Sequence, residues 1–281
     1  MPQKLTLLIN CPDQKGIVSA ISAFVAEHGA NIIDSQQHSL GLDARFFMRL
    51  EIDTTGSSLT QEELQKAFQP IADKYDIDFS FKYGIKKMAI LVSKYDHCLY
   101  DILLRQQYGE LQVEIPIIIS NHPDLEPVAK HFGIEFEHCP INGSKQEQEK
   151  QIISCLQKHQ VDFVALARYM QILSADFIAH YPHKIINVHH GFLPAFKGAK
   201  PYHQAYEKGV KIIGATAHYA TEDLDMGPII SQDVIEVANR DSVEDYISKG
   251  RDIEKTVFAK AIKAQAESKI ILHDSRTIIF D

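Results

Sequence analysis

The sequence predicts an α/β protein of two domains, a small one with the element order βαββαβ and a larger one with an open, mainly parallel sheet. Over residues 1–84, short apolar strand runs alternate with two stretches of helical spacing. From residue 85 onward the strand runs are apolar without alternation, as in strands that helices bury on both faces. The 281 residues are enough for two domains, which we expect at 1–84 and 85–281.

Local start and stop signals predict the elements of the first domain. Gly29 ends a helix of regular apolar spacing, and Thr60 with Glu63 forms a capping box at the start of another. Gly41-Leu42-Asp43 offers turn chemistry between two strands. We expect a strand at 5–9, a helix at 17–28, strands at 31–39 and 45–53, a helix at 60–74 and a strand at 76–83. This order is that of the ferredoxin-like fold.

The second domain is predicted as a sheet with helices on both faces. Its strands are expected at 88–92, 114–119, 161–165, 185–189, 211–219 and 229–237. Its helices are expected at 99–104, 125–132 and 152–159, the last after a capping box of Ser144 and Glu147. Ligands of such sheets bind beyond the carboxyl ends of the strands, so candidate residues are sought there.

Three polar residues near those strand ends can be given catalytic roles if the substrate is a formamide. Asn187 and His189 emerge on the same face of one strand because strand side chains alternate, and Asp225 lies in the loop 221–228. The Asn187 amide and a protonated His189 would stabilise the oxyanion formed by attack on a formyl carbon. Asp225 would favour the imidazolium and orient or deprotonate the attacking water. The departing amine would receive its proton from His189 or a relayed water.

Composition argues against several classes of protein. The net charge of -8, with acidic residues spread along the chain, disfavours nucleic-acid binding. The four cysteines form no CxxC pair, which disfavours a disulfide framework or a zinc knot and fits a reducing cytoplasm. The start of the sequence lacks the pattern of a secretory signal, and no run reaches the length of a membrane span, so we expect a cytoplasmic protein without a membrane role.

Two segments of the first domain resemble the ACT domain family. They are the run from Cys11 to Val18 at the first strand-to-helix turn and the run from His28 to Ile32 at the next. The resemblance implies a small bound ligand, typically an amino acid, and sheets that pair between subunits, hence a homo-oligomer, either dimer or tetramer. The effector contacts it implies are Asp13, Gly16, Ile17 and Asn31. The alternative is that Gly16 only serves the turn and the domain only dimerises.

Three blocks of the second domain resemble the formyltransferase-fold folate enzymes, whose fold is Rossmann-like. They are Asn187-Val188-His189-His190, the run 193–198 and the run 224–230. The family's catalytic asparagine, histidine and aspartate fall on Asn187, His189 and Asp225. The run 167–173 resembles the family's folate segment, although core packing also explains its apolar residues. The substrate contacts implied are Met170, Gln171, Ile172, Leu173, Gly198, Glu222, Asp223 and Leu224.

Further features resemble the formyltetrahydrofolate deformylase branch of that family. Family transferases acting on glycinamide ribonucleotide hold the acceptor phosphate on a glycine-rich loop, whereas residues 88–108 contain no glycine here. The runs 93–97 and 198–205, and an ACT-like domain ahead of the formyl domain, match the deformylase branch. The resemblance implies hydrolysis of 10-formyltetrahydrofolate to tetrahydrofolate and formate, supplying formate for purine biosynthesis, with no cofactor or metal. Gly191, Lys197 and Met226 depart from the expected serine, isoleucine and glutamate, which puts the pocket shape in doubt.

Three alternatives stay open at this point. A folate-dependent formyltransferase with an amine acceptor is the nearest, because Lys94 can attract a phosphate by charge. A non-catalytic amino-acid sensor is a second. A zinc hydrolase is a third, with ligands from His189, His190, His203, His218 and Asp225. If the chain is an effector-controlled enzyme, we expect methionine or glycine as the effector, because the one-carbon pool feeds both.

Overall fold

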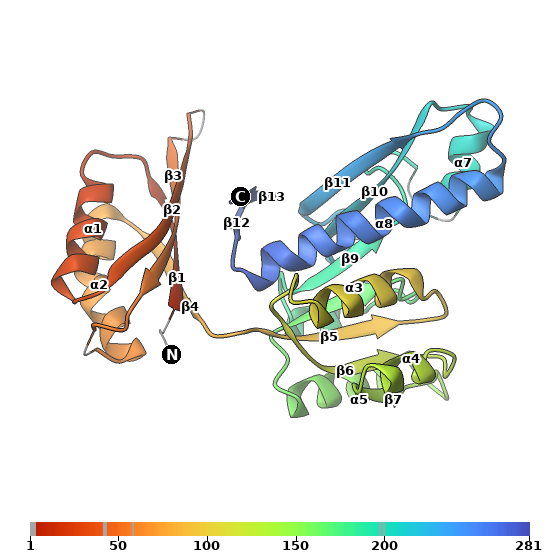
Figure 1. Cartoon of the computed structure of the whole chain (residues 1–281), viewed down its shortest axis with the longest axis horizontal. Coiled ribbons are helices and arrows are strands. Elements are labelled where there is room, and N and C mark those ends of the chain that lie inside the picture. Colours follow the sequence, from red (N-terminus) through yellow and green to blue (C-terminus); the bar gives the residue numbers. More distant parts are fainter. Residues whose placement is uncertain (1–3, 42–43, 58, 197, 199) are drawn as a thin grey trace. The chain divides into compact units, whose positions relative to one another are not determined.

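The computed structural model describes residues 4–41, 44–57, 59–196, 198 and 200–281 (Figure 1). Contacts between α-carbons divide the chain into two compact units. The small unit contains the chain up to Gly84 together with 268–274 and 278–281, and the large unit contains 85–267 and 275–277. Leu42 and Asp43 of the expected turn, and Lys197 and Ala199 of the family-like runs, lie outside the described residues.

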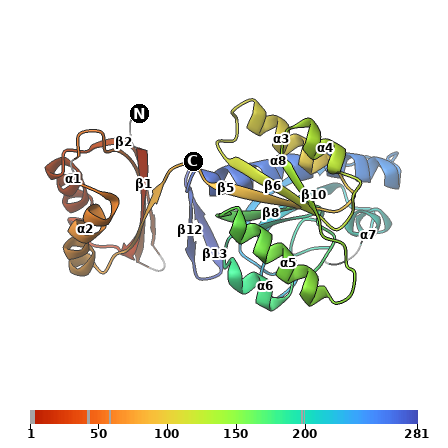
Figure 2. The same cartoon turned by 90° about the horizontal axis from the view of Figure 1, so that it is seen from below.

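The small unit has the predicted βαββαβ order. Its elements are β1 (Lys4–Pro12), α1 (Ile17–Glu27), β2 (Asn31–Leu40), β3 (Arg45–Asp53), α2 (Gln61–Tyr75) and β4 (Asp78–Tyr83). The four strands form one antiparallel sheet in the order β2-β3-β1-β4, and both helices cover the same face of it (Figures 1 and 2). The ferredoxin-like fold is therefore confirmed.

Alternation along β1 explains why this sheet has two apolar faces. Leu5, Leu7 and Ile9 are at most 3% exposed and pack in the core beneath α1 and α2, around Phe68. Leu8 points to the opposite face. The predicted capping box of α2 is present, because Thr60 Oγ1 accepts from the Glu63 amide and the Glu63 carboxylate accepts from the Thr60 amide at 2.8 Å.

The outer face of this sheet is covered by the end of the chain. A hairpin of β12 (Ile270–His273) and β13 (Arg276–Ile279) brings Ile271 and Phe280 against Leu8 and Phe47. The sequence analysis does not predict these strands, because local pattern does not tell which distant sheet a short apolar run will cover. The domain boundary at residue 84 stays a prediction. The contacts between α-carbons show in addition that most of the hairpin belongs with the small unit.

The large unit is built on a seven-stranded sheet of order β11-β10-β9-β8-β5-β6-β7. Its strands are β5 (Lys87–Val92), β6 (Glu114–Ser120), β7 (Glu135–His138), β8 (Phe163–Ala167), β9 (Ile185–His189), β10 (Ile212–Tyr219) and β11 (Ile229–Glu236). The first five are parallel to one another, whereas β10 runs antiparallel to both β9 and β11. The predicted open, mainly parallel sheet is therefore confirmed.

Helices cover both faces of this sheet (Figure 2). They are α3 (His97–Gln107), α4 (Glu126–His131), α5 (Lys145–Lys158), α6 (Ala175–His180), α7 (Pro201–Glu207) and α8 (Val243–Ala266). The sequence analysis does not predict β7, α6, α7 or α8. The first three are short, and β7 is a polar edge strand. None of the described helices is long and apolar enough to cross a membrane.

The chain order of these strands creates a topological switch point. From β5 the chain proceeds to β6 and β7 on one side, and it then returns to form β8 and β9 on the other side of β5. The loops that follow β5 and β8 consequently diverge and leave a crevice at the carboxyl ends of these strands, where ligands of open α/β sheets bind.

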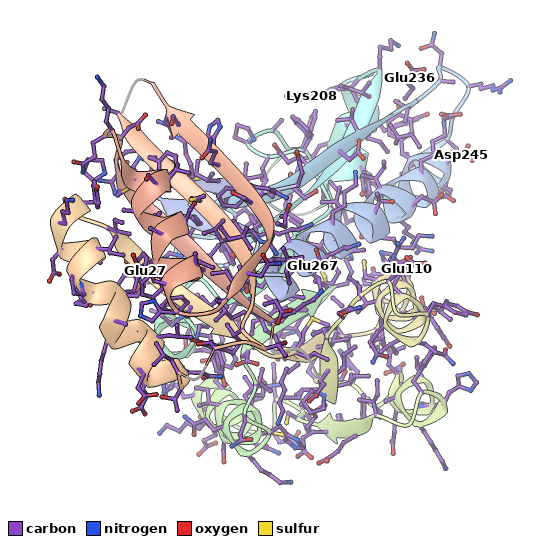
Figure 3. All side chains as sticks on the ribbon, turned by 60° about the vertical axis from the view of Figure 1, so that its left-hand side comes forward. Glu27, Glu110, Lys208, Glu236, Asp245 and Glu267 are labelled. Carbon is purple, nitrogen blue, oxygen red and sulfur yellow. The ribbon has the colours of Figure 1, made fainter. Side chains whose placement is uncertain are left out.

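Acidic side chains are spread over both units rather than gathered in one region. Glu27 of α1, Glu236 of β11 and Asp245 of α8 illustrate this (Figure 3).

The hairpin contact predicts a stability change with a neighbouring control. Phe280 is 5% exposed and fills the outer-face cluster, whereas Ile279 beside it is 41% exposed. We expect Phe280→Ala to destabilise the protein by about 3 kcal/mol through lost burial and the cavity left behind. Ile279→Ala should change stability by less than about 1 kcal/mol. Thermal unfolding of both variants checks this, and equal melting temperatures for the two would contradict the contact.

Candidate active site

The large unit contains a cleft of about 270 Å³ lined by the segment after β8, the end of β9 and the loop between β10 and β11. It brings together most of the residues that the sequence singles out. Those lining it are Met170, Gln171, Ile172, Leu173, Asn187, His189, Gly198, Glu222, Leu224 and Asp225. Asp223 belongs to the same loop but is exposed and is not among the lining residues.

His189 and Asp225 form the central contact of the cleft. His189 is 5% exposed, and its Nδ1 lies 3.2 Å from Asp225 Oδ2. An ionised carboxylate only accepts hydrogen bonds, so Nδ1 carries the proton and donates it. The other ring nitrogen, Nε2, is buried without a hydrogen-bond partner in the described protein. The Asp225 contact thus orients the ring and leaves Nε2 available for a substrate.

Asn187 is oriented by a residue that the sequence analysis considered only as a zinc ligand, His218. Antiparallel pairing of β9 with β10 places His218 opposite Asn187. His218 Nδ1 lies 2.9 Å from the carbonyl oxygen of Tyr219 and must donate to it, so in the neutral ring Nε2 accepts from Asn187 Nδ2 at 3.2 Å. The second amide hydrogen of Asn187 is then free to donate to a ligand. Alternation within the predicted strand 211–219, combined with antiparallel pairing, was the signal for His218.

The backbone around Asp225 is unusual. Asp225 has a φ of 58°, a left-handed conformation that costs a residue with a side chain about 1 kcal/mol or more. Two residues on, a β-carbon at Gly227 would overlap the carbonyl of Tyr219, so only glycine fits there. Burial raises the pKa of Asp225, but the hydrogen bond from His189 and the His218 imidazole 3.7 Å away outweigh it and hold that pKa well below its usual range. Asp225 is therefore a fixed negative charge at neutral pH.

Arg168 and His190 add a charged and a neutral group to the cleft. Both line it, and sequence reasoning quoted Arg168 only as part of a longer run and singled out His190 only as a candidate zinc ligand. Burial, followed by the charge of Arg168, lowers the pKa of His190 to about 3. His190 is therefore uncharged at neutral pH. Neither residue follows from strand alternation, because both come just after a strand ends.

The rim of the cleft is apolar and open to solvent. Met170 is 50% exposed, Ile172 61% and Leu224 56%. The core-packing interpretation is therefore wrong for Met170 and Ile172, although Leu173 does pack partly on the core of the large unit. Apolar side chains beside a few buried polar groups are typical of a binding site for a small molecule.

The residues proposed to bind an effector lie at the start of α1 and β2. Gly16 precedes α1 with a φ of 96°, which favours glycine, and a β-carbon there would lie 3.1 Å from Tyr75 Oη. Asp13 and Asn31 are exposed, whereas the Ile17 side chain is 2% exposed and belongs to the core. The side chain of Ile17 is therefore occupied by core packing.

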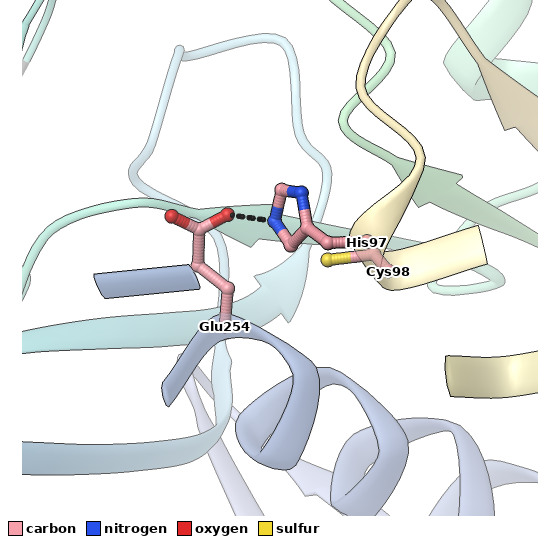
Figure 4. Close-up of side chains that lie close together, drawn as sticks. All are labelled: His97, Cys98 and Glu254. Atoms are coloured by element: carbon pink, nitrogen blue, oxygen red, sulfur yellow. Dashed lines mark hydrogen bonds and ion pairs between the residues drawn. The ribbon is translucent and has the colours of Figure 1, made fainter. Parts of the chain in front are cut away.

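One group of potential metal ligands occurs among the residues that the structure describes. His97, Cys98 and Glu254 each place a ligand atom within 4.8 Å of the others (Figure 4). This group shares no member with the set of five residues considered under the zinc-hydrolase alternative. Its neighbours, described below, decide how it is best interpreted.

Comparison with known proteins agrees with this fold. The formyl transferase family model matches residues 86–262 and the ACT domain model matches residues 5–69, which defines a formyl transferase domain preceded by an ACT domain. A formyltetrahydrofolate deformylase of Synechocystis sp. is 48% identical over 98% of both chains, and one of Bacillus subtilis is 47% identical over 98% of this chain and 93% of its own. The crystal structure of a formyltetrahydrofolate deformylase from Pseudomonas syringae superposes with a TM-score of 0.96 at 42% identity, over 100% of this chain and 95% of that one. The chain belongs to the formyltetrahydrofolate deformylase family.

The lowered pKa of His190 predicts how stability depends on pH. In the unfolded chain His190 gains a proton below about pH 6.5, whereas in the folded protein it stays neutral down to about pH 3. The unfolded state then binds more protons, so His190 costs stability as pH falls, at most about 1.4 kcal/mol per pH unit. We expect the melting temperature of the parent protein to fall more steeply than that of His190→Gln between about pH 7 and 5.

The matched control for this measurement is His138→Gln, because His138 is exposed at the end of β7. That variant should follow the parent protein across the pH range. Parallel curves for the parent protein and His190→Gln would show that His190 is not held neutral.

Proposed function

We propose that this chain hydrolyses 10-formyltetrahydrofolate to tetrahydrofolate and formate, and that Asn187, His189 and Asp225 act on the formyl group. One observation carries the proposal. His189 Nε2, a donor once the imidazole is protonated, and the free amide hydrogen of Asn187 lie in one cleft, each oriented from behind by a second residue and each without another partner among the described residues. The names of the relatives, which are curated as formyltetrahydrofolate deformylases, support the same reaction.

We assign binding of the pterin to the apolar rim of the cleft. The pterin lies against Met170, Ile172 and Leu173, and the loop with Leu224 covers its other side. The formyl group at N10 then reaches the buried polar end of the cleft, beside Asn187 and His189. Binding energy from the pterin thereby places the formyl carbon next to the donors, which lowers the entropic part of the barrier.

The chemical step adds water across the formyl amide. The water oxygen bonds to the formyl carbon, and the charge that develops on the formyl oxygen is stabilised by the Asn187 amide and by protonated His189. When the intermediate collapses, the C–N10 bond breaks and formate leaves. One proton of the water reaches N10 through His189 or a second water, and the other is released to solvent. Atoms and charge balance without any oxidant or metal.

The low pKa of Asp225 limits its part in this step. A carboxylate that holds its proton so weakly is a poor general base at neutral pH. It is a good fixed acceptor, however, both for the His189 Nδ1 proton and for an attacking water. We therefore assign Asp225 to orienting the water and stabilising the imidazolium, with the proton itself passing elsewhere.

The small unit is assigned to regulation. We propose that it binds a small molecule, with methionine and glycine the first to be tested, near Asp13, Gly16 and Asn31 and the backbone of Ile17. A homo-oligomer, dimer or tetramer, and a cytoplasmic location stay predictions. An absence of cofactor and metal is expected in the same way.

A substitution at Asp225 tests the proposed chemistry. With 10-[¹³C]formyltetrahydrofolate and no acceptor, ¹³C NMR should show formate appearing with the parent protein and at least about 100-fold more slowly with Asp225→Asn. Glu236→Gln, which removes an exposed carboxylate on β11, should match the parent protein. An intact substrate with the parent protein would indicate a transferase awaiting its acceptor, and normal turnover by Asp225→Asn would refute its role.

Effector binding predicts a coupled change in rate and stability. Methionine or glycine should raise the melting temperature, because a ligand that binds only the folded state stabilises it, and should alter the rate of formate release. Gly16→Ala should abolish both effects, since alanine is strained at a φ of 96°. Equal rates and equal melting temperatures with and without each amino acid would exclude these two effectors.

A further inference from the structure

The crevice at the switch point of the large unit is filled by the protein's own charged groups. His97 follows β5 and Arg168 follows β8, so the two residues come from opposite sides of the crevice. Glu254 of α8 reaches between them. His97 Nε2 donates to Glu254 Oε2 at 2.8 Å, and Arg168 Nε lies 3.5 Å from the same oxygen (Figure 4 shows the His97 contact).

The carboxylate of Glu254 has the surroundings of a bound anion. Glu254 is 0% exposed, and Tyr202 Oη donates to its second oxygen, Oε1, at 2.7 Å. Burial raises the pKa of Glu254, but the hydrogen bond from His97 and the charge of Arg168 outweigh it, so that pKa lies below its usual value. Glu254 is therefore an ionised group held entirely by protein donors.

The donors themselves are arranged as an anion site. His97 is the first residue of α3, an 11-residue helix, so its backbone amides and helix dipole favour negative charge at this point. The Arg168 side chain is 10% exposed, and its Cζ lies 4.9 Å from the centroid of the Tyr95 ring. Its Nη1 is buried without a hydrogen-bond partner in the described protein. The crevice thus offers more donors than the carboxylate of Glu254 uses.

A glycine in α8 makes room for this arrangement. A β-carbon at Gly250 would overlap the ring of Tyr202, and Gly250 lies one turn before Glu254 on the same helix. Glycine inside a helix costs about 1 kcal/mol relative to alanine. Glycine is needed at this position because Tyr202 passes close to the helix there and donates to Glu254.

A metal ion is the competing interpretation of His97, Cys98 and Glu254. Arg168 argues against it, because a guanidinium 3.5 Å from Glu254 repels a cation at the same place. Burial and the charge of Glu254 also raise the pKa of Cys98, so Cys98 adds no charge to this cluster. The charges around this cluster suit an anion better than a cation.

We propose that the side chain of Glu254 is a built-in anion that occupies an anion-binding position formed by Arg168, His97 and the start of α3. A second substrate carrying a phosphate or carboxylate group finds that position filled, so water is left as the acceptor of the formyl group. This consequence for specificity rests on the proposed hydrolysis. The occupied anion position itself does not.

Removing the carboxylate should open the site to an anion from solution. In the full chain, acetate and inorganic phosphate should leave the melting temperature of the parent protein unchanged relative to chloride at the same ionic strength. Glu254→Ala should melt lower, and acetate or phosphate should raise its melting temperature saturably by about 2–4 °C. The double variant R168Q/E254A should lose that rise. Glu244→Ala, an exposed glutamate of the same helix, should behave as the parent protein.

Two outcomes would overturn the proposal. In the first, Glu254→Ala folds but neither acetate nor phosphate raises its melting temperature. In the second, phosphate raises the melting temperature of the parent protein, and Arg168→Gln removes that rise. Stabilisation of the parent protein by Zn²⁺ that Cys98→Ser abolishes would identify a metal site instead. If Glu254→Ala does not fold, Glu254→Gln keeps the side-chain volume, and Arg168→Gln should then restore part of the melting temperature that Glu254→Gln loses. None of these measurements uses deformylation, so they stay decisive even if the proposed reaction is not observed.

Discussion

The contact between Asp225 and His189 is the constraint on which the rest of the cleft depends. It joins the loop after β10 to the last residue of β9 and fixes which nitrogen of His189 carries a proton. The loop reaches that position only with Asp225 in a left-handed conformation and with Gly227 against the carbonyl of Tyr219. Local backbone strain at a functional residue is tolerated when the surrounding structure imposes it. Here the hydrogen-bonding partners of Asp225 impose it.

The same loop links the two donors. His218 lies 3.7 Å from Asp225 Oδ1 as well as beside Asn187, so one carboxylate is near both His189 and the imidazole that orients Asn187. Side chains with fixed partners need little reorganisation when charge develops on a substrate, which is the physical basis of a preorganised site. The interior of the cleft is therefore rigid and polar, while its rim is apolar and exposed.

Much of this arrangement was predictable from sequence, for definite reasons. Strand alternation places Asn187 and His189 on one face, capping boxes set the starts of α2 and α5, and unalternating apolar strands indicate a covered parallel sheet. Strand pairing was not predictable in the same way. The contact of His218 with Asn187 was therefore missed, although the strand that contains His218 was expected. Glu254 was beyond reach, because 157 residues separate it from His97 and nothing local in α8 marks a buried carboxylate. The hairpin over the small unit was missed for the same reason.

Two buried carboxylates, Asp225 and Glu254, have different partners in the large unit. Asp225 holds the groups assigned to the formyl carbon, whereas Glu254 satisfies the cationic and dipolar groups at the switch point. Buried charges are expensive unless they are paired and hydrogen-bonded, and both carboxylates meet that condition. On the proposed assignments, a site that fills its own anion position while presenting Asn187 and His189 to the formyl group favours water over a charged acceptor.

The most direct test of the central claim is a crystal structure of the protein with tetrahydrofolate and formate bound. The account predicts the pterin against Met170 and Leu173, and one formate oxygen within hydrogen-bonding distance of both His189 Nε2 and Asn187 Nδ2. Asp225 should keep its contact with His189. A folate bound elsewhere, or formate held away from both donors, would contradict the assignment of this cleft as the active site.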